Sequence, residues 1–370
     1  MPPMIPHDSP LRQRISPPSP LDVLDETHRR ALNRAVGNVL RTEVAELTYA
    51  QILDGLPTVK SVTDSYPYLK DHPVYTINHV DICPGFVELA RDHRSGFTMH
   101  NMDFNTKTLE KFQAASEPRE FHLRLIELVV SACHQIGAYL FKLDGGVHKH
   151  EFYQEWRNKV LEEKRNGVEA RKYYIPSPIA FSHRSYRAFD QYPMGLADVA
   201  GYWAESKIFG GVVVFDRGET ETECKSMWIH GDLVKGPQTL YPPTEEQFSD
   251  LVKFLTSVPN EDSKCPFPIH GTRVNRPRWD AYDAFAHHHI FRDKYERKLP
   301  SKSPRRGCVQ NTIDWPELED QRILMLANFA TPEGGSYSSE EEVAAAEKGI
   351  SNITRSSPLW RLAGNSPTPR

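Results

Sequence analysis

The chain of 370 residues has a formal net charge of −4 at pH 7, which argues against a surface that is electropositive throughout, as a general DNA-binding protein has. It contains no run of about 18 apolar residues, and its N-terminus lacks the charged-then-apolar order of a secretory signal. We therefore expect a cytoplasmic protein with no DNA partner and no membrane partner. Any contact with RNA should be confined to a local basic patch.

Both ends of the chain differ in composition from its interior. Closely spaced prolines in residues 1–25 remove backbone donors, and apolar residues there are too sparse to offset the entropy of ordering, which predicts a disordered arm. Residues 331–370 are rich in glycine, serine and glutamate and are expected to form a disordered tail, with room for a short helix near Glu341–Lys348. Residues 26–330 hold almost all the aromatic residues and long apolar runs, which predicts one compact domain.

The cysteines are odd in number and scattered, and none forms a CxxC pair that would indicate zinc or a disulfide framework. We expect reduced and mostly buried thiols, with no bound metal and no cofactor. The five residues are Cys83, Cys133, Cys224, Cys265 and Cys308.

Hydrophobic spacing predicts the elements of the first half of the domain. Residues 27–56 have apolar positions near helical spacing and predict one long or broken helix with Thr27 as N-cap. The β-branched run 74–80 predicts a strand. Residues 121–143 are apolar on most faces and predict a central helix with a glycine C-cap at Gly145-Gly146, and 151–165 predict a charged surface helix with one apolar stripe.

The second half combines two strands with two helices. Residues 208–216 and 224–232 are rich in β-formers and are joined by a polar connection, which predicts a β-hairpin. The helices are expected at 195–206 and at 244–255, the latter with glutamates in its first turn. The fold class is therefore mixed α/β (α+β), a single compact domain with a central helix and a sheet that contains the hairpin.

The segment Asp280–Lys298 is the richest in ionisable groups within the domain. If it is helical through Glu296, then His289, Asp293 and Glu296 lie at i, i+4 and i+7 and share one face. An imidazole and two carboxylates on one face are suited to acid–base chemistry or to binding a metal. The alternative is a solvated helix face stabilised by i, i+4 pairs such as Arg292 with Glu296.

The triple histidine His287-His288-His289 has the residue type of a zinc site, but three adjacent helical residues point in different directions and do not easily bind one ion.

Two other polar groups are candidate functional sites. One comprises Trp203 and Glu205 before the hairpin and Asp216 and Arg217 at its turn. These residues suit recognition of a cationic substrate, although salt bridges that stabilise the turn have the same pattern.

The other polar group is a loop, Ser182–Arg187, that mixes hydroxyls, a histidine, arginines and a tyrosine. Arginine forms bidentate contacts with phosphate and tyrosine stacks on bases, so this loop is a candidate RNA contact, with an ordinary exposed polar loop as the alternative. The arginines expected to contact RNA are Arg184, Arg187, Arg273, Arg276 and Arg278. Neither GxSxG, GxGxxG nor GxxxxGK[ST] occurs, which argues against the corresponding hydrolases and nucleotide-binding enzymes.

Between Asp190 and Pro300 the chain contains four characteristic segments: GYWAESKIFGGVVVFDRGE, a Pro-Pro-Thr helix start, CPFPI and IFRDKYERKLP. Together they resemble the arginine-containing cyclodipeptide synthases of fungi. The resemblance implies an enzyme of secondary metabolism that takes arginine and a second amino acid from aminoacyl-tRNAs and joins them into a cyclic dipeptide (a diketopiperazine). It implies arginyl-tRNA and a second aminoacyl-tRNA as partners, and no ATP step.

The same resemblance associates function with a DDxxE motif. Its counterpart here is Arg292-Asp293-Lys294-Tyr295-Glu296, which keeps the second aspartate and the glutamate but has arginine at the first position. The resemblance therefore implies Asp293 and Glu296 as catalytic residues, and Arg292 and His289 beside them as substrate contacts, with Glu205 and Asp216 as further partners for a guanidinium. Two rival hypotheses are a metal-dependent hydrolase or oxygenase using the histidine-rich segment, and a non-catalytic interaction protein using the Trp203–Trp228 region as its surface.

Overall fold

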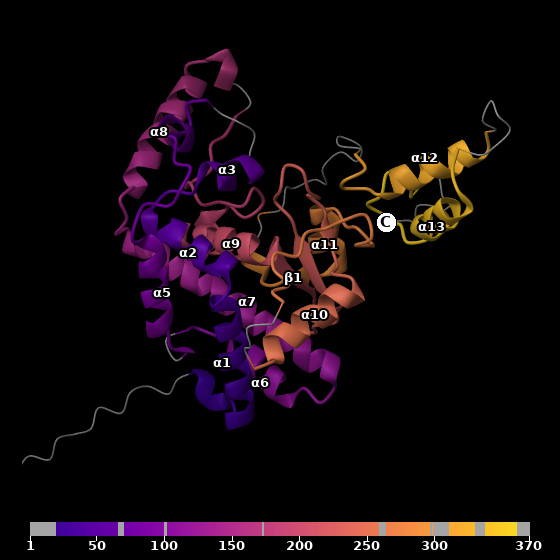
Figure 1. Cartoon of the computed structure of the whole chain (residues 1–370), viewed down its shortest axis with the longest axis horizontal. Coiled ribbons are helices and arrows are strands. Elements are labelled where there is room, and N and C mark those ends of the chain that lie inside the picture. The colour runs from indigo at the N-terminus through magenta and orange to yellow at the C-terminus, as the bar shows by residue number, and fades with distance from the viewer. Residues whose placement is uncertain are drawn as a thin grey trace, which may run out of the picture.

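The computed structural model describes residues 20–65, 70–99, 102–171, 174–258, 264–296, 298, 311–329 and 337–360. Helices surround a small antiparallel sheet, so the predicted mixed α/β class is confirmed (Figure 1). The helices are α1 (Glu26–Leu40), α2 (Glu43–Asp54), α3 (Val59–Ser65), α4 (Pro73–Thr76), α5 (Phe86–Gly96), α6 (Thr106–Ala114), α7 (Pro118–Leu143), α8 (His150–Arg165), α9 (Leu196–Phe209), α10 (Glu245–Thr256), α11 (Ala281–His288), α12 (Glu317–Ala327) and α13 (Glu340–Ile350). The strands are β1 (Val212–Asp216), β2 (Met227–His230), β3 (Leu240–Tyr241) and β4 (Ile290–Phe291).

The central helix is α7, which is buried along most of its length, as its apolar sequence predicts. Its C-cap is Asp144, whose φ of 41° is left-handed, and not the glycine pair that follows. Helix α9 packs against α7 at a place where both helices carry glycine. A Cβ on Gly137 would lie 2.8 Å from the Cβ of Ala204, and one on Gly201 would lie 2.7 Å from the carbonyl oxygen of His134. The two glycines therefore permit the close approach of the helices.

We expect Gly201→Ala to lower the free energy of unfolding by about 1–3 kcal/mol, because the added methyl group would overlap the α7 backbone. Urea denaturation would measure the change. Gly96→Ala is the matched control, since Gly96 is the last residue of α5 and has open space where its Cβ would be. Equal stabilities of the two variants would contradict this account of the packing.

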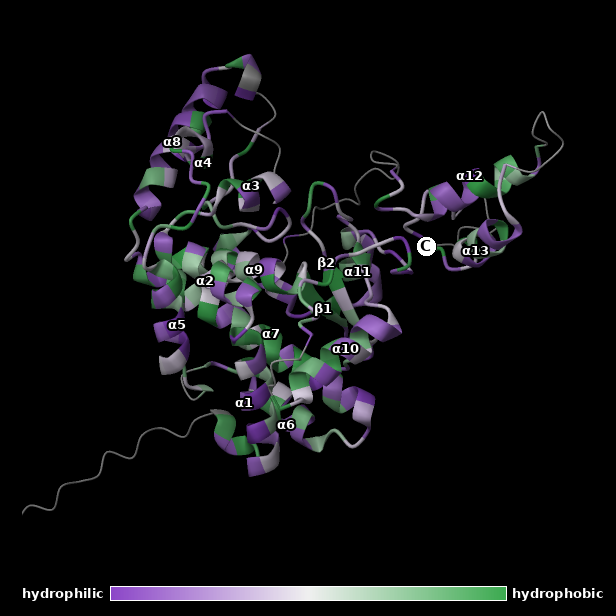
Figure 2. Cartoon of the chain, in the orientation of Figure 1, coloured by the Kyte–Doolittle hydropathy of each residue, from purple (hydrophilic) through white to green (hydrophobic). Residues whose placement is uncertain are grey.

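The predicted hairpin is confirmed, with β1 and β2 antiparallel and Val214 opposite Trp228. The sheet has the order β3-β2-β1-β4. Strands β1 and β2 are hydrophobic and almost completely buried (Figure 2), which explains why their sequences lack polar alternation. The sequence did not predict β3 and β4, because a strand of two residues is too short to show a periodic pattern of apolar residues.

Two local predictions need correction, the N-cap of the first helix and the strand 74–80, while the broken form of the helix predicted at 27–56 is confirmed. Residues 27–56 form two helices, α1 and α2, and the N-cap of α1 is Asp25 and not Thr27, because the Asp25 carboxylate accepts from the His28 N–H at 2.9 Å. The predicted strand 74–80 is wrong, since Pro73 occupies the first turn of helix α4. The helix expected at 244–255 is confirmed as α10, with a capping box between Thr244 and Gln247.

Both predicted tails are partly folded. In the predicted arm, Leu21 and Leu24 are buried, so residues 20–25 belong to the domain, while 1–19 lie outside the described residues. In the predicted tail, α13 confirms the short helix and packs against α12 (Figure 1). The prediction of disorder is thus wrong for 337–360.

The pair of helices is joined to the domain by polar contacts. The Asp314 carboxylate accepts from the backbone N–H groups of Gln238 and Thr239, at 2.6 and 3.0 Å. The Thr354 hydroxyl donates to the Arg278 carbonyl at 2.5 Å. No helix in the described part of the chain is both long and apolar enough to cross a membrane.

Candidate functional site

The segment predicted to carry the site is not one helix. Helix α11 ends at His288, His289 has a left-handed φ of 53°, and the chain then enters β4, where Phe291 lies opposite Phe215 of β1. A short 3-10 turn, Lys294–Glu296, follows. The prediction that His289, Asp293 and Glu296 share a helix face is therefore wrong, because pairing with the sheet interrupts the helix.

The three residues have different surroundings. His289 Nδ1 lies 3.1 Å from a carboxylate oxygen of Glu221, in the loop that joins β1 to β2. Asp293 is half-buried, and its carboxylate accepts from the Tyr295 hydroxyl at 3.4 Å. Glu296 is completely enclosed, with an exposed fraction of 1%. The structure therefore separates the three side chains, and Glu296 is the one that is fully buried.

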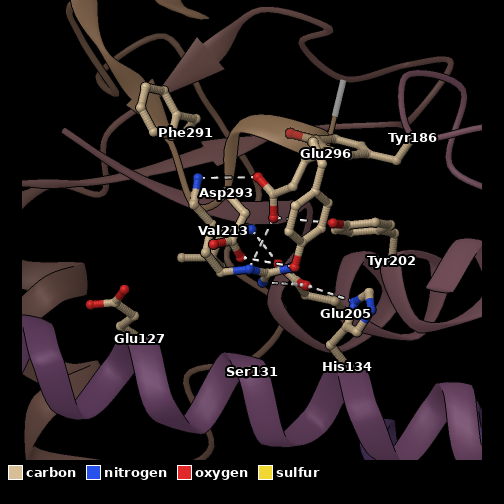
Figure 3. A network of polar contacts seen from close by, with 12 residues as sticks. Glu127, Ser131, His134, Tyr186, Tyr202, Glu205, Val213, Phe291, Asp293 and Glu296 are labelled. Carbon is tan, nitrogen blue, oxygen red and sulfur yellow. Dashed lines mark hydrogen bonds and ion pairs between the residues drawn. The ribbon is translucent and has the colours of Figure 1, made fainter. Parts of the chain in front are cut away.

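Glu296 belongs to a buried group that we call the Arg292 cluster, formed by Tyr202, Glu205, Arg292 and Glu296 (Figure 3). The Arg292 guanidinium lies between two carboxylates: Nη1 is 2.8 Å from Glu205 and Nε is 3.0 Å from Glu296. Its central carbon lies 5.4 Å from the centre of the Tyr202 ring. The Glu205 side chain is fully buried and that of Arg292 is 8% exposed, so these charges interact with little screening by water.

The fold positions each member of the cluster through the backbone as well as through charge. Tyr202 and Glu205 lie three residues apart on α9 and so share a face. Glu205 also accepts from the Val213 N–H at 2.6 Å, which ties α9 to β1. One oxygen of Glu296 accepts from the Tyr202 hydroxyl and the other from the Arg292 backbone N–H, both at 3.1 Å. All the polar groups of the cluster are thereby held in fixed positions.

Burial raises the pKa of Glu296 to about 7, and the nearby carboxylates of Asp293 and Glu205 add to this rise, although Arg292 opposes it. Burial also raises the pKa of Tyr202. A carboxyl group with a pKa near 7 exchanges a proton at neutral pH, which is the property required of a general acid or base. The cluster can therefore support proton transfer.

His134 of α7 joins the cluster from below (Figure 3). Its Nε2 lies 3.0 Å from Asp198, and its Nδ1 lies 3.7 Å from Glu205. Burial acts to lower the pKa of His134, but the contacts with Asp198 and Glu205 outweigh it and the pKa is raised. Sequence reasoning missed His134 and Asp198, because they lie on apolar helices and their partners come from distant parts of the chain.

A second group of buried ion pairs lies beside the Arg292 cluster and holds the backbone there in place. Arg217 binds Glu127 of α7 at 2.8 Å, and Arg124 binds the same carboxylate at 2.9 Å. Arg217 also donates to the carbonyl groups of Phe291 and Arg292, both at 2.9 Å. Arg217 therefore positions the backbone that carries Arg292.

The four residues predicted around the hairpin do not form one site. Glu205 lies in the Arg292 cluster, and Arg217 acts on the backbone next to it. Trp203 is a core residue with an exposed fraction of 2%. Asp216 accepts from the Gly218 N–H at 2.8 Å, so it stabilises the hairpin turn through a backbone hydrogen bond, whereas the alternative interpretation proposed a salt bridge.

The arginines predicted to contact RNA are mostly engaged within the protein. Arg184 binds the Asp232 carboxylate at 3.0 Å, and Arg276 binds Asp320 of α12. Arg278 is 3% exposed and lies over the Tyr241 ring, so the prediction is wrong for this residue. The Arg273 side chain also pairs with Asp320 but is 47% exposed, and Arg187 is half-buried.

No protein-family model, curated protein or solved structure matches the chain. The resemblance of residues 190–300 to cyclodipeptide synthases therefore stays a prediction, which depends on the sequence segments alone.

Proposed function

We propose that the protein is an arginine-containing cyclodipeptide synthase, an enzyme that condenses arginine and a second amino acid from their aminoacyl-tRNAs. The observation that carries the proposal is Glu296, a buried carboxyl group with a pKa of about 7 in the position of the motif glutamate. Aminoacyl esters are already activated, so the protein has to orient an amine against an ester and move one proton. No cofactor is required for this chemistry.

In the proposed reaction the α-amine of one aminoacyl group attacks the ester carbonyl of the other. A C–N bond forms, the C–O bond to the tRNA ribose breaks, and Glu296, which is enclosed in the free protein and must be uncovered when the substrates bind, transfers the proton from the amine to the departing ribose oxygen. A second attack, by the free amine of the dipeptidyl ester on its own carbonyl, closes the ring and releases the second tRNA. Each step conserves its proton, so no oxidant or reductant is needed.

Arg292 has a supporting role in this scheme. Its guanidinium is already held by Glu205 and Glu296, so these carboxylates do not act as the receptor for the guanidinium of the substrate. The half-buried carboxylate of Asp293, with Tyr295 beside it at an exposed fraction of 42%, is the better candidate for binding the cationic side chain. Asp293 therefore binds substrate in the proposal, and Glu296 transfers the proton.

The test is reconstitution of the full chain with tRNA, aminoacyl-tRNA synthetases, arginine and a mixture of the other amino acids. Mass spectrometry should detect a cyclic dipeptide that contains arginine, and treatment with RNase before the reaction should abolish it. Absence of such a mass, or a product that survives RNase, would overturn the proposal.

The two rival hypotheses receive less support from the described residues. His289 and Glu296 bind different partners, Glu221 and Arg292, so they do not form the shared ligand set that the metal-dependent alternative requires. Trp203 and Trp228 are 2% and 7% exposed, so neither tryptophan offers the surface expected of an interaction protein.

A further inference from the structure

Four side chains of metal-ligand type meet at the C-terminal end of α2, on the side of the domain that carries α8. They are Asp54, His79, Cys83 and His148, and one ligand atom from each lies within 4.8 Å of the others. Asp54 and His79 are buried, whereas Cys83 and His148 are partly exposed. The mechanism proposed above does not use any of them.

The spacing of the ligand atoms matches a small tetrahedral site. His79 Nε2 lies 3.1 Å from Asp54 Oδ2, Cys83 Sγ lies 3.5 Å from His148 Nε2, and His148 Nε2 lies 3.9 Å from Asp54 Oδ1. Metal–ligand bonds of about 2.0–2.3 Å in a tetrahedron place the ligand atoms about 3.3–3.8 Å apart. These three separations bracket this range, and the remaining pairs of ligand atoms lie within 4.8 Å.

One oxygen of the Asp54 carboxylate accepts a hydrogen bond, and the other has no hydrogen-bond partner. Oδ2 accepts from the Cys83 N–H at 2.8 Å and contacts His79. Oδ1 is buried and receives no hydrogen bond. A fully buried carboxylate oxygen without a donor is costly, and a cation between Oδ1 and the facing imidazole of His148 would remove this cost.

The His79 ring is oriented as a metal-binding histidine is. Its Nδ1 lies 3.0 Å from the Pro57 carbonyl oxygen, which only accepts, so Nδ1 carries a proton. Its Nε2 then faces the Asp54 carboxylate, another acceptor, and a proton or a cation must lie between the two. A carbonyl that receives the distal N–H of a histidine is the usual outer contact of a metal ligand.

Two glycines allow the backbone at the end of α2 to lie close to the loop that carries His148. A Cβ on Gly146 would lie 2.2 Å from the Asp54 carbonyl oxygen, and one on Gly55, whose φ is 95°, would lie 1.6 Å from that of His148. The His148 N–H donates to the Asp54 carbonyl at 2.9 Å. The cluster opens onto a groove of about 880 Å³ lined by His79, Cys83 and His148, which gives an ion a path from solvent.

We propose that Asp54, His79, Cys83 and His148 bind one Zn²⁺ ion. Thiolate and imidazole ligands favour zinc over Mg²⁺ and Ca²⁺, which require oxygen ligands. A thiolate and a carboxylate neutralise the charge of the ion, and binding releases the thiol proton and the proton between His79 and Asp54. The ion would join the end of α2 to the loops that carry His79 and His148.

The test uses the full chain, freed of metal with a chelator and then supplied with Zn²⁺ or Co²⁺. We expect about one ion per chain by elemental analysis, a Co²⁺–thiolate charge-transfer band, and a Tm that falls when EDTA is added. Cys83→Ser should abolish the band, and His148→Gln should weaken zinc binding by at least about 10–100-fold, because loss of a ligand exceeds the loss of an outer contact.

Cys265→Ser is the matched control, since Cys265 is an exposed thiol outside the cluster, and it should retain stoichiometric zinc and the band. Circular dichroism establishes that each variant is folded. If Cys83→Ser does not fold, the Co²⁺ spectrum of the unaltered protein still decides the question. Absence of stoichiometric zinc, absence of the thiolate band, or zinc binding that survives both substitutions would overturn the proposal.

Discussion

Replacing Glu205 with alanine is expected to lower the free energy of unfolding by about 3–5 kcal/mol, the cost of breaking a buried ion pair by removal of one partner. Glu205 is fully buried, and its loss would leave the Arg292 guanidinium with Glu296 as its remaining carboxylate partner in the Arg292 cluster. It would also leave the Val213 N–H at the start of β1 without its acceptor. Urea denaturation followed by circular dichroism measures this effect.

Two variants show whether the charge of Glu205 or its burial is responsible for the expected loss of stability. Glu205→Gln keeps an oxygen for Val213 but removes the charge, so it should be intermediate in stability. Glu88→Ala removes an exposed carboxylate that pairs with Arg91 at 3.8 Å, and it should change the free energy of unfolding by less than about 1 kcal/mol. Equal effects for Glu205→Ala and Glu88→Ala would contradict the account of Glu205 as a buried ion-pair partner of Arg292.

Replacing Glu296 with glutamine is expected to reduce product formation by about 10²–10⁴-fold, the usual contribution of a positioned acid or base. The amide keeps the shape of the side chain and an acceptor for the Tyr202 hydroxyl, so the fold should persist. The rate of cyclic dipeptide formation is the measurement. Because the ionised form acts as the base, the rate in the unaltered protein should rise with pH to a plateau above about 7, the pKa of Glu296.

The same substitution has a predicted effect on stability. The pKa of Glu296 is higher in the folded protein than its ordinary value of 4.5, so the folded state binds more protons between pH 4.5 and about 7. Its contribution to the free energy of unfolding therefore falls as the pH rises through this window. Glu296→Gln should show a smaller loss of stability over that range.

Asp293→Asn separates the two proposed roles. Asp293 is half-buried and binds the substrate in the proposal, so its replacement should mainly raise KM for arginyl-tRNA, whereas Glu296→Gln should mainly lower kcat. Unchanged product formation in Glu296→Gln would remove the Arg292 cluster from the mechanism.

Local sequence determined the elements whose signal lies within one segment. The apolar run of α7, the hairpin of β1 and β2 and the helix at 244–255 each depend on spacing over a few residues, and all three appear as predicted. The family resemblance predicts Glu296 as a catalytic carboxylate, through the motif that ends there, and this stays a prediction. The segment that contains Glu296 has the pattern of a helix, because β4 is only two residues long and is recognisable only by its pairing with β1.

The i, i+4 spacing predicts the pair of Arg292 with Glu296, but only the tertiary structure decided their other partners. Arg292 meets Glu205 across 87 residues of chain, and Tyr202 meets Glu296 across 94, so no local spacing signals either contact. The same holds for the proposed zinc site, where Asp54 ends α2, His148 lies in the loop before α8, and only His79 and Cys83 are close in sequence. Burial and long-range pairing set the charges and pKa values of these groups, and both arise only when distant segments pack together.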